Sequence, residues 1–556
     1  MLSNSRLRRF AEALVVLALV ALPGLAQQTP SVTELNDRLL ELQEQVSGAA
    51  PEQAVGLRNQ AAGVIQFRQR ALSALIAQNP QQALPLAFAP GVLAQLASSF
   101  PGSAAQLESR GVWQGELAYL IEDDESMAAS RTHLRLRTEQ EVLQLHLAVA
   151  QPPGLRSGVQ LQVAGLRAGD SVAVESATLL PAPPAPPLVC STQGAQPIVA
   201  ILANLQSFTL GAGITQDLVW GILLGNAFAP TSQNPGNRHV DDFWQQNSDG
   251  KTSVDSATSV VVGPYTLPGD YNTDGECDPD SMLADALAAA DPDVNFNDYT
   301  RVMIVFPQNM ACSFAGLASV GCFTNSSPHE HNFNASVSWN RADQMDTRNS
   351  GVQLITHEGG HNLGLAHASS RDFGAKTLGP IGTPGTHDEY GDVFSTMGAW
   401  NFGFYSAQHA AEQLDWLTLD TNYQVVETNG TYTIENYEKR PAGMKALKVR
   451  RGTGNDAWLW IEYRQNTGLY DSRLNSQVWD GVLIHHQDST TDPGYTYLPD
   501  FFEPAMDDWT DVALPAGSTW TDSHSNLFLR VSNATATSVD VTVTYLKKRK
   551  GQLISD

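Results

Sequence analysis

The sequence predicts a multidomain protein in which helices and a small β domain come first, an α/β unit follows, and a β-sandwich ends the chain. Its 556 residues exceed the length at which a single hydrophobic core stops growing. With 42% hydrophobic and 16% charged residues, the chain has enough apolar material to fold. Changes in the spacing of its apolar residues, and one proline-rich tract, indicate where the parts meet.

Residues 1–26 are typical of a secretory signal peptide. Three arginines precede an apolar run from Ala13 to Leu22, and small residues suited to signal peptidase end at Ala26. The run is too short to span a bilayer comfortably, and no other stretch of about 18 apolar residues follows. We therefore expect a secreted, extracellular protein without a stable membrane anchor, which passes through a periplasm where the cell has one.

The net charge and the cysteine content also indicate an exported protein. A formal net charge of −25 disfavours nucleic-acid binding and suits solubility outside the cell. Cys190, Cys277, Cys312 and Cys322 are even in number and lack the CxxC spacing of a structural zinc site, so disulfides are expected. Cys312 and Cys322 enclose a short loop and are expected to pair, which leaves Cys190 and Cys277 as a long-range pair.

The segments before the α/β unit differ in their apolar spacing. Residues 27–110 carry leucines at helical spacing and predict a helical N-terminal region. Residues 111–180 change to short alternating runs, with a turn at Gly169, and predict a small β domain. Prolines dominate residues 181–187, which predict an extended linker because proline cannot supply a sheet ladder.

Residues 188–425 form the expected α/β unit, and residues 426–556 the expected β-sandwich. In the first of these segments, residues 197–205 and 302–306 are apolar enough for buried strands, and residues 282–290 between them are expected to be helical. In the second, short apolar runs recur at close intervals, which is typical of a sandwich: 432–434, 447–449, 458–463, 482–485, 528–531 and 539–545.

One segment carries the pattern of a catalytic metal site. Residues 357–367 match HExxHxxGxxH at every fixed position. Residues four apart share one face of a helix, so His357 and His361 can aim at one zinc ion while Glu358 lies beside the open coordination position. Gly364 lets the chain leave the helix, so that His367 can return as the third ligand.

These ligands predict a hydrolytic reaction. Zinc bound by three histidines and a water lowers the pKa of that water to roughly 7. Glu358 would act as general base on this zinc-bound water and then protonate the leaving amine, while zinc stabilises the developing oxyanion. Two helix-weakening glycines inside the motif argue against a helix whose histidines merely pack.

Met397 lies in a tight glycine-containing turn thirty residues after the motif, where a methionine is expected beneath the zinc histidines. Together these segments resemble the gametolysin family of metzincin metallopeptidases. The residues that carry the resemblance are HEGGHNLGLAHA at 357–368, EYGD at 389–392, STMG at 395–398, GLA at 316–318 and WIEYR at 460–464.

The resemblance implies a metzincin-like catalytic domain with a mixed sheet and an active-site helix. It also implies a zinc ion, Met397 as the Met-turn, and hydrolysis of peptide bonds in extracellular proteins or peptides. One departure concerns residues 398–400, Gly-Ala-Trp, because astacin-like enzymes place a tyrosine there that can approach zinc. A fifth ligand from this turn is therefore not expected.

A weaker pattern suggests calcium as a second cofactor. The alternating side chains and the glycine of residues 270–278 resemble the first half of a calcium loop, but Ser281 stands where the loop usually has its last glutamate. A plain turn rich in Asp and Asn is the competing interpretation. The candidate calcium ligands are Asp270, Asn272, Asp274 and Asp278.

Cys190 has two competing interpretations. It follows the proline-rich linker, where a thiolate could occupy the open zinc position and keep a zymogen inactive until the preceding regions are removed as a propeptide. A disulfide is favoured by the even number of cysteines. Two rival functions also remain: a secreted binding or adhesion protein carrying a relic zinc site, which the intact Glu358 disfavours, and a purely structural zinc site.

Overall fold

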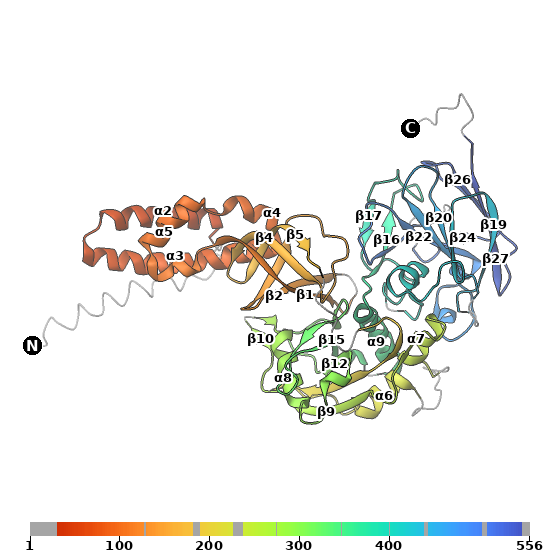
Figure 1. Ribbon diagram of the computed structural model, residues 1–556, viewed down its shortest axis with the longest axis horizontal. Coiled ribbons are helices and arrows are strands. Elements are labelled where there is room, and N and C mark those ends of the chain that lie inside the picture. The colour runs from red at the N-terminus through yellow and green to blue at the C-terminus, as the bar shows by residue number, and fades with distance from the viewer. Residues whose placement is uncertain are drawn as a thin grey trace, which may run out of the picture. The chain divides into compact units, whose positions relative to one another are not determined.

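The computed structural model of the chain (Figure 1) describes residues 30–126, 129–181, 190–225, 237–273, 275–345, 347–399, 401–438, 443–502 and 509–547. The expected signal peptide, residues 182–187 of the expected linker, Asp274 and Trp400 lie outside these ranges. No helix within them is both long and apolar enough to cross a membrane.

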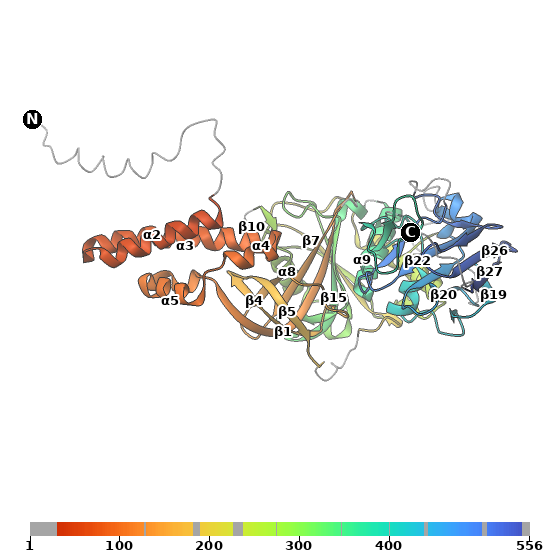
Figure 2. The same cartoon turned by 90° about the horizontal axis from the view of Figure 1, so that it is seen from above.

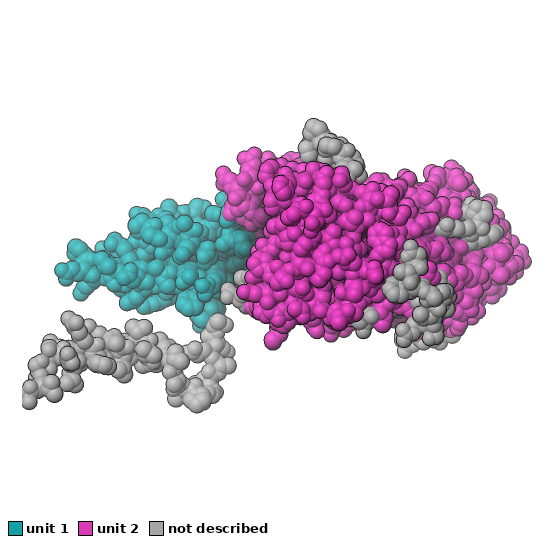
Figure 3. All heavy atoms as spheres, turned by 90° about the horizontal axis from the view of Figure 1, so that it is seen from below, with its two compact units in different colours: residues 1–110, 166–173 teal, residues 111–165, 174–556 magenta. Residues whose placement is uncertain are grey.

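The chain divides into two compact units, which Figure 3 colours separately. The first comprises residues 1–110 and 166–173, and the second comprises residues 111–165 and 174–556. The segments expected from the sequence are finer than this division, so their boundaries stay a prediction.

The first unit is built mainly from helices, as its leucine spacing predicts. Ser31 caps the first helix in a capping box with Glu34. Leu39, Leu42 and Ile65 are buried together in the core between the helices. The helices are α2 (Val32–Gly48), α3 (Pro51–Gln78), α4 (Pro80–Ala83) and α5 (Pro90–Ser99).

A mixed sheet organises the first half of the second unit. Its strands follow one another in the order β2, β3, β5, β4, β1, β13, β15, β12, β7 and β9, and β14 also pairs with β15. Strands β15, β12, β7 and β9 run parallel, whereas β13 is antiparallel to β15 and β1 is antiparallel to β13. The strands are β1 (Ser109–Asp123), β2 (Ser130–Arg137), β3 (Val142–Leu147), β4 (Gln160–Ala168), β5 (Ser171–Leu179), β7 (Ile198–Asn204), β9 (Val260–Thr266), β12 (Arg301–Phe306), β13 (Gly316–Ser319), β14 (Phe323–Asn325) and β15 (Phe333–Arg341).

Helices cover both faces of the parallel strands. Ala200 and Leu202 of β7 belong to one core with residues of α6, α7 and α9, whereas Val199 and Ile201 belong to another with residues of α8. Burial on both faces explains why the strands expected at 197–205 and 302–306 are almost continuously apolar. The predicted α/β unit with a mixed sheet is thus confirmed. Its helices are α6 (Gln216–Leu224), α7 (Val240–Asn247), α8 (Pro279–Ala290) and α9 (Arg348–Leu363).

The C-terminal strands form two sheets that share one hydrophobic core, as a β-sandwich requires. Helix α9 lies between these strands and the mixed sheet in both views (Figures 1 and 2). One sheet has the order β18 (Tyr423–Val426), β20 (Ala446–Arg450), β21 (Trp458–Glu462), β22 (Gly481–Gln487) and β24 (Leu514–Pro515). The other has the order β19 (Gly430–Glu435), β27 (Ser538–Tyr545), β26 (Leu527–Ser532) and β25 (Thr519–Thr521).

Small sheets complete the second unit. Strand β16, which follows the histidine motif directly, pairs with β17 and runs parallel to β23 from the C-terminal region. The chain leaving the motif is thereby held between segments distant in sequence. These strands are β6 (Gly194–Gln196) with β8 (Thr252–Val254), β10 (Asn272–Thr273) with β11 (Glu276–Cys277), and β16 (Ala368–Asp372) with β17 (Thr386–Asp388) and β23 (Thr496–Leu498).

Two disulfides are present, and the pairing expected from the sequence is wrong. Cys190 pairs with Cys322, and Cys277 pairs with Cys312. The chain between Cys312 and Cys322 includes strand β13, and an extended strand carries its ends apart. Cys277, at the end of the β10–β11 hairpin, instead lies with its Cα 4.7 Å from that of Cys312.

Candidate metal centre

Helix α9 holds the first part of the histidine motif where the sequence predicts it. Thr347 caps its first turn, and its side chain accepts a hydrogen bond from the Ser350 backbone N–H. The helix ends at Gly364, whose φ of 108° lies in the left-handed region that favours glycine. The chain therefore turns sharply after the second histidine and returns His367 to the same site, as expected.

The three histidines converge on a carboxylate that the sequence did not indicate, Asp123 at the end of β1. The Nε2 atoms of His357 and His361 lie 3.5 and 3.4 Å from its Oδ2 atom. The Nε2 atom of His367 lies 2.9 Å from its Oδ1 atom. One potential ligand atom from each of the four side chains lies within 4.8 Å of the others, and all four side chains are buried. Among the described residues, no other group of this kind could hold a metal.

Each histidine ring is oriented by an oxygen at its other nitrogen. The Nδ1 atoms of His357 and His361 lie 2.6 and 2.8 Å from the carbonyl oxygens of Thr396 and Leu365. A carbonyl oxygen can only accept, so these Nδ1 atoms donate, and the Nε2 atoms of the neutral rings keep their lone pairs for a metal.

The third ring has a carboxylate as its partner. The Nδ1 atom of His367 lies 2.8 Å from Oε1 of Glu389. Burial favours the neutral acid, but the hydrogen bond from His367 outweighs it and lowers the pKa of Glu389 below 4.5. An ionised Glu389 accepts this bond and leaves Nε2 of His367 facing the centre of the site.

These residues fit a divalent metal ion. The Nε2 atom of His361 and both carboxylate oxygens of Glu358 are buried and have no hydrogen-bond partner among the described residues. Burying such atoms without partners is costly. Burial alone would lower the pKa of His367, but Asp123 raises it to about 9, which shows that this point attracts positive charge. A cation there would satisfy the rings and balance the carboxylate.

Glu358 lies beside the histidines, against strand β13. A Cβ atom at Gly316 would overlap its carboxylate, so only glycine leaves room for this side chain. Burial raises the pKa of Glu358 well above 4.5, and the nearby Asp123 raises it further. The glycine that begins the GLA segment thus positions the carboxylate next to the site.

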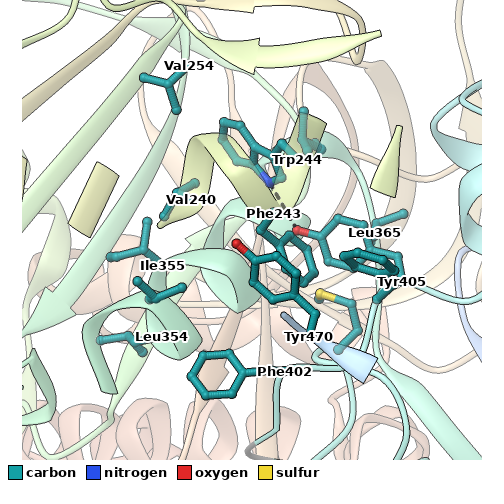
Figure 4. Close-up of a cluster of buried hydrophobic side chains, with 14 of the residues drawn as sticks. Val240, Phe243, Trp244, Val254, Leu354, Ile355, Leu365, Phe402, Tyr405 and Tyr470 are labelled. Carbon is teal, nitrogen blue, oxygen red and sulfur yellow. Dashed lines mark hydrogen bonds between the residues drawn. The ribbon is translucent and has the colours of Figure 1, made fainter. Parts of the chain in front are cut away.

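The turn that carries Met397 packs against helix α9, and the two glycines of the motif make this possible. A Cβ atom at Gly360 would overlap the sulfur of Met397, which is fully buried. One at Gly359 would come within 2.9 Å of the Trp244 ring. The Trp244 indole N–H donates to the Tyr405 hydroxyl at 3.3 Å (Figure 4). The glycines that weaken the helix are therefore required by its neighbours.

Replacing Gly360 by alanine is expected to destabilise the second unit by about 1–3 kcal/mol, because the new methyl group overpacks the contact with Met397. Calorimetry should record a lower Tm for the main transition. Gly63→Ala is the matched control, since Gly63 also lies inside a helix but has open space around its Cβ position. That change should stabilise its helix slightly. Equal Tm values for wild type and Gly360→Ala would contradict the packing argument.

A tyrosine approaches the site from the EYGD segment, although the sequence did not indicate it as a site residue. The hydroxyl of Tyr390 donates to Oδ1 of Asp123 at 2.5 Å, and its ring centroid lies 4.4 Å from that of His367. Burial and the adjacent Asp123 raise the pKa of Tyr390 above its usual range, so the hydroxyl stays a donor. The EYGD segment therefore supplies two groups here, Glu389 to His367 and Tyr390 to the centre.

The sequence does not predict that Asp123 and Tyr390 belong to the site, and the reasons differ. Asp123 precedes His367 by 244 residues and reaches it only through the pairing of β1 with β13. Its only local signal is its position in an acidic run, EDDE, at the end of an alternating strand. Tyr390 lies in the EYGD segment, but nothing in the spacing of that segment indicates which way its side chain points.

The remaining candidates do not join this group. Cys190 is bonded to Cys322, so the hypothesis of a Cys190 thiolate on the metal is wrong. In the candidate calcium loop, Asp278 caps helix α8, and Asp270 and Asn272 accept hydrogen bonds from backbone N–H groups. Asp274 lies outside the described residues, so calcium binding stays a prediction.

Comparison with known protein families gives a match over the segment that holds most of this centre. No curated protein matches the chain. A family model described as gametolysin peptidase M11 matches residues 197–410, which include the whole histidine motif, Tyr390 and Met397 but not Asp123. Over this segment, which is less than half of the chain, the sequence is similar to the gametolysin family of metallopeptidases.

Proposed function

We propose that the chain is a secreted zinc metalloendopeptidase, made as a precursor, that hydrolyses peptide bonds of extracellular proteins with Glu358 as the general base. One observation carries the proposal: three Nε2 atoms converge on one point, each ring is fixed from behind by an oxygen, and Glu358, whose carboxylate has no hydrogen-bond partner among the described residues, lies beside them. A metallopeptidase needs this combination of a held metal and an adjacent base.

Zinc is the metal that the donor set favours. Imidazole nitrogens with an oxygen as fourth ligand suit tetrahedral zinc, whereas calcium and magnesium prefer sets composed of oxygens. When bound, zinc supplies a Lewis acid and lowers the pKa of a coordinated water to about 7. We expect His357, His361 and His367 to hold it, with Met397 packed beneath as the Met-turn of a metzincin-like domain.

Glu358 moves the proton in the proposed reaction. Its carboxylate takes a proton from the attacking water and delivers it to the amide nitrogen as the peptide bond breaks. Gly316 keeps the space that this carboxylate occupies, and burial strengthens its interactions by excluding water. The basic form of Glu358 and a neutral His361, whose pKa burial lowers to about 4, are the states that this role requires.

Tyr390 is placed to stabilise the transition state. Its protonated hydroxyl points at Asp123 Oδ1, next to the histidine nitrogens. A substrate carbonyl oxygen that took the place of this carboxylate oxygen would receive the same hydrogen bond. A preorganised donor of this kind is most useful when negative charge develops on that oxygen during attack.

Two features support export of the protein. Both disulfides belong to an oxidising compartment, and they involve all four cysteines of the chain. The strongly negative charge suits a soluble extracellular protein. The expected signal peptide at residues 1–26 would direct the chain there, and proteins or peptides in that space would be its substrates.

A second candidate function is favoured by Asp123. Four protein ligands close a zinc site, and closed sites are typical of structural zinc. The chain would then be a secreted binding or adhesion protein whose metal only stabilises the fold. This candidate predicts a zinc-loaded protein that cleaves nothing, even after Asp123 is removed as a ligand.

Removal of the metal separates these functions. Treating the processed enzyme with 1,10-phenanthroline should lower the cleavage of an unfolded protein at least about 100-fold, because zinc contributes several kcal/mol to transition-state stabilisation. Adding stoichiometric zinc after removal of the chelator should restore cleavage. The non-chelating 1,7-isomer is the control. Cleavage that survives complete loss of zinc, measured by elemental analysis, would contradict the proposal.

A further inference from the structure

We propose that strand β1 keeps the precursor inactive, with Asp123 as the fourth ligand of the metal that His357, His361 and His367 hold. This inference rests on the proposed function, because it names how the same site is regulated. It assigns to a carboxylate the role that Cys190 cannot have, since Cys190 is held in a disulfide.

The carboxylate of Asp123 occupies the position that a catalytic site must leave open. Its side chain is 0% exposed, and its two oxygens lie 2.9 to 3.5 Å from all three Nε2 atoms. Three histidines with one carboxylate complete a tetrahedral set. Water and substrate would then both be excluded from the metal, because neither the water oxygen nor the substrate carbonyl oxygen would find a free coordination position.

Strand β1 also covers the sheet edge beside the site. Its residues 120–123 pair antiparallel with β13, and Asp123 stands opposite Gly316, the residue that makes room for Glu358. The other neighbour of β13 is β15. Without β1, strand β13 would be an edge with free backbone groups, onto which an extended polypeptide could add as a strand. One element thus blocks both the metal and this edge.

Further contacts fasten the chain around β1 to the segments that surround the site. Ser130, at the start of β2, donates to Oε1 of Glu389 at 2.5 Å. Glu125, just after β1, forms an ion pair with Arg341 at the end of β15. The Ser157 backbone N–H donates to the Val320 carbonyl at 2.9 Å, next to β13. The position of Asp123 is therefore fixed from several directions.

Two observations distinguish a removable ligand from a permanent one. Asp123 precedes the segment 197–410 that matches the peptidase family, so the family part of the chain contains the three histidines and Glu358 without it. Asp123 is also buried opposite Gly316, whose Cβ position lies against the Glu358 carboxylate, and two buried carboxylates close together cost free energy that a permanent structural site would not need. The presence of both carboxylates is explained if Asp123 leaves the site on activation and Glu358 then acts as the base without it.

Cobalt(II) in place of zinc reports the open position directly, without an activity assay. Acetohydroxamic acid binds a metal only where a coordination position is free. The visible spectrum of the full-length cobalt protein should not change with this probe, whereas that of full-length Asp123→Ala should. The apparent affinity for the probe should rise at least about 100-fold in the variant, because a tethered carboxylate competes at an effective concentration of millimolar or more.

Asp124→Ala is the matched control, since Asp124 is the exposed neighbouring aspartate and its carboxylate accepts hydrogen bonds from Ser126, two residues along the chain. It should behave like wild type. Asp123→Asn preserves the shape of the side chain and gives the same readout if the alanine variant does not fold, because a neutral amide is a weaker ligand. A wild-type spectrum that responds to acetohydroxamic acid as strongly as either Asp123 variant would overturn the proposal.

The same proteins separate this inference from the proposed function. If Asp123→Ala binds the probe but the processed enzyme, which lacks β1, cleaves no unfolded protein, the closed site stands and the peptidase proposal is removed. The opposite outcome is a full-length wild-type precursor that cleaves as fast as Asp123→Ala and is shown to be intact by mass spectrometry. It would overturn the closed site and leave the peptidase proposal standing.

Discussion

Replacing Glu358 by glutamine in the active enzyme is expected to lower kcat for a peptide substrate by about 10²–10⁴, the usual contribution of a general base. The amide has the same shape but takes no proton from the attacking water. Glu358 is not one of the converging ligands, so the variant should still bind one zinc per chain by elemental analysis.

Glu276→Gln, at the exposed position of strand β11, is the control for the chemical change alone. It should keep both its activity and its zinc. If the Glu358 variant cleaved the substrate at the wild-type rate with zinc bound, Glu358 would not be the base. If it lost its zinc, the side chain would instead have a role in metal binding.

The second large effect concerns the hydroxyl of Tyr390. Phenylalanine at this position should lower kcat by about 10²–10³ and leave KM nearly unchanged, as for the loss of one oxyanion donor. The measurement belongs in an Asp123→Ala background, because in the precursor this hydroxyl bonds to Asp123. A transition-state donor affects kcat, whereas a group that only binds substrate affects KM.

Tyr265→Phe is a matched control for this experiment. Its hydroxyl also donates to a carboxylate, that of Asp293, but it lies on strand β9 of the mixed sheet rather than among the metal ligands. Both kinetic constants should be unchanged there. A Tyr390→Phe variant with wild-type kcat would show that the hydroxyl serves only to hold Asp123 in the precursor.

Local patterns in the sequence predicted the elements of the site that depend on neighbours along the chain. The helix with two histidines four residues apart, and its end at Gly364, follow from helical geometry and from the freedom of glycine, and the structure confirms both. The buried strands β7 and β12 are nearly continuous apolar runs, and such a local pattern predicts a buried strand in the same way.

Features that depend on sheet register could not be predicted. Asp123 faces the histidines only because β1 pairs with β13 in one particular register, and a shift by one residue would turn it to the opposite face. The predicted disulfide pairing is wrong because strand β13 lies between Cys312 and Cys322 and separates them. The two glycines of the motif were recognised as unusual, but the partners that require them, Met397 and Trp244, come from distant segments.

Mass spectrometry of the products from an unfolded protein substrate tests the central claim most directly. The Asp123→Ala chain, loaded with one zinc ion, should produce fragments cut at internal peptide bonds, and the Asp123→Ala/Glu358→Gln chain should produce none under the same conditions. An intact substrate after prolonged incubation with the folded, zinc-loaded Asp123→Ala chain and with the processed wild-type enzyme would contradict the assignment of a zinc endopeptidase.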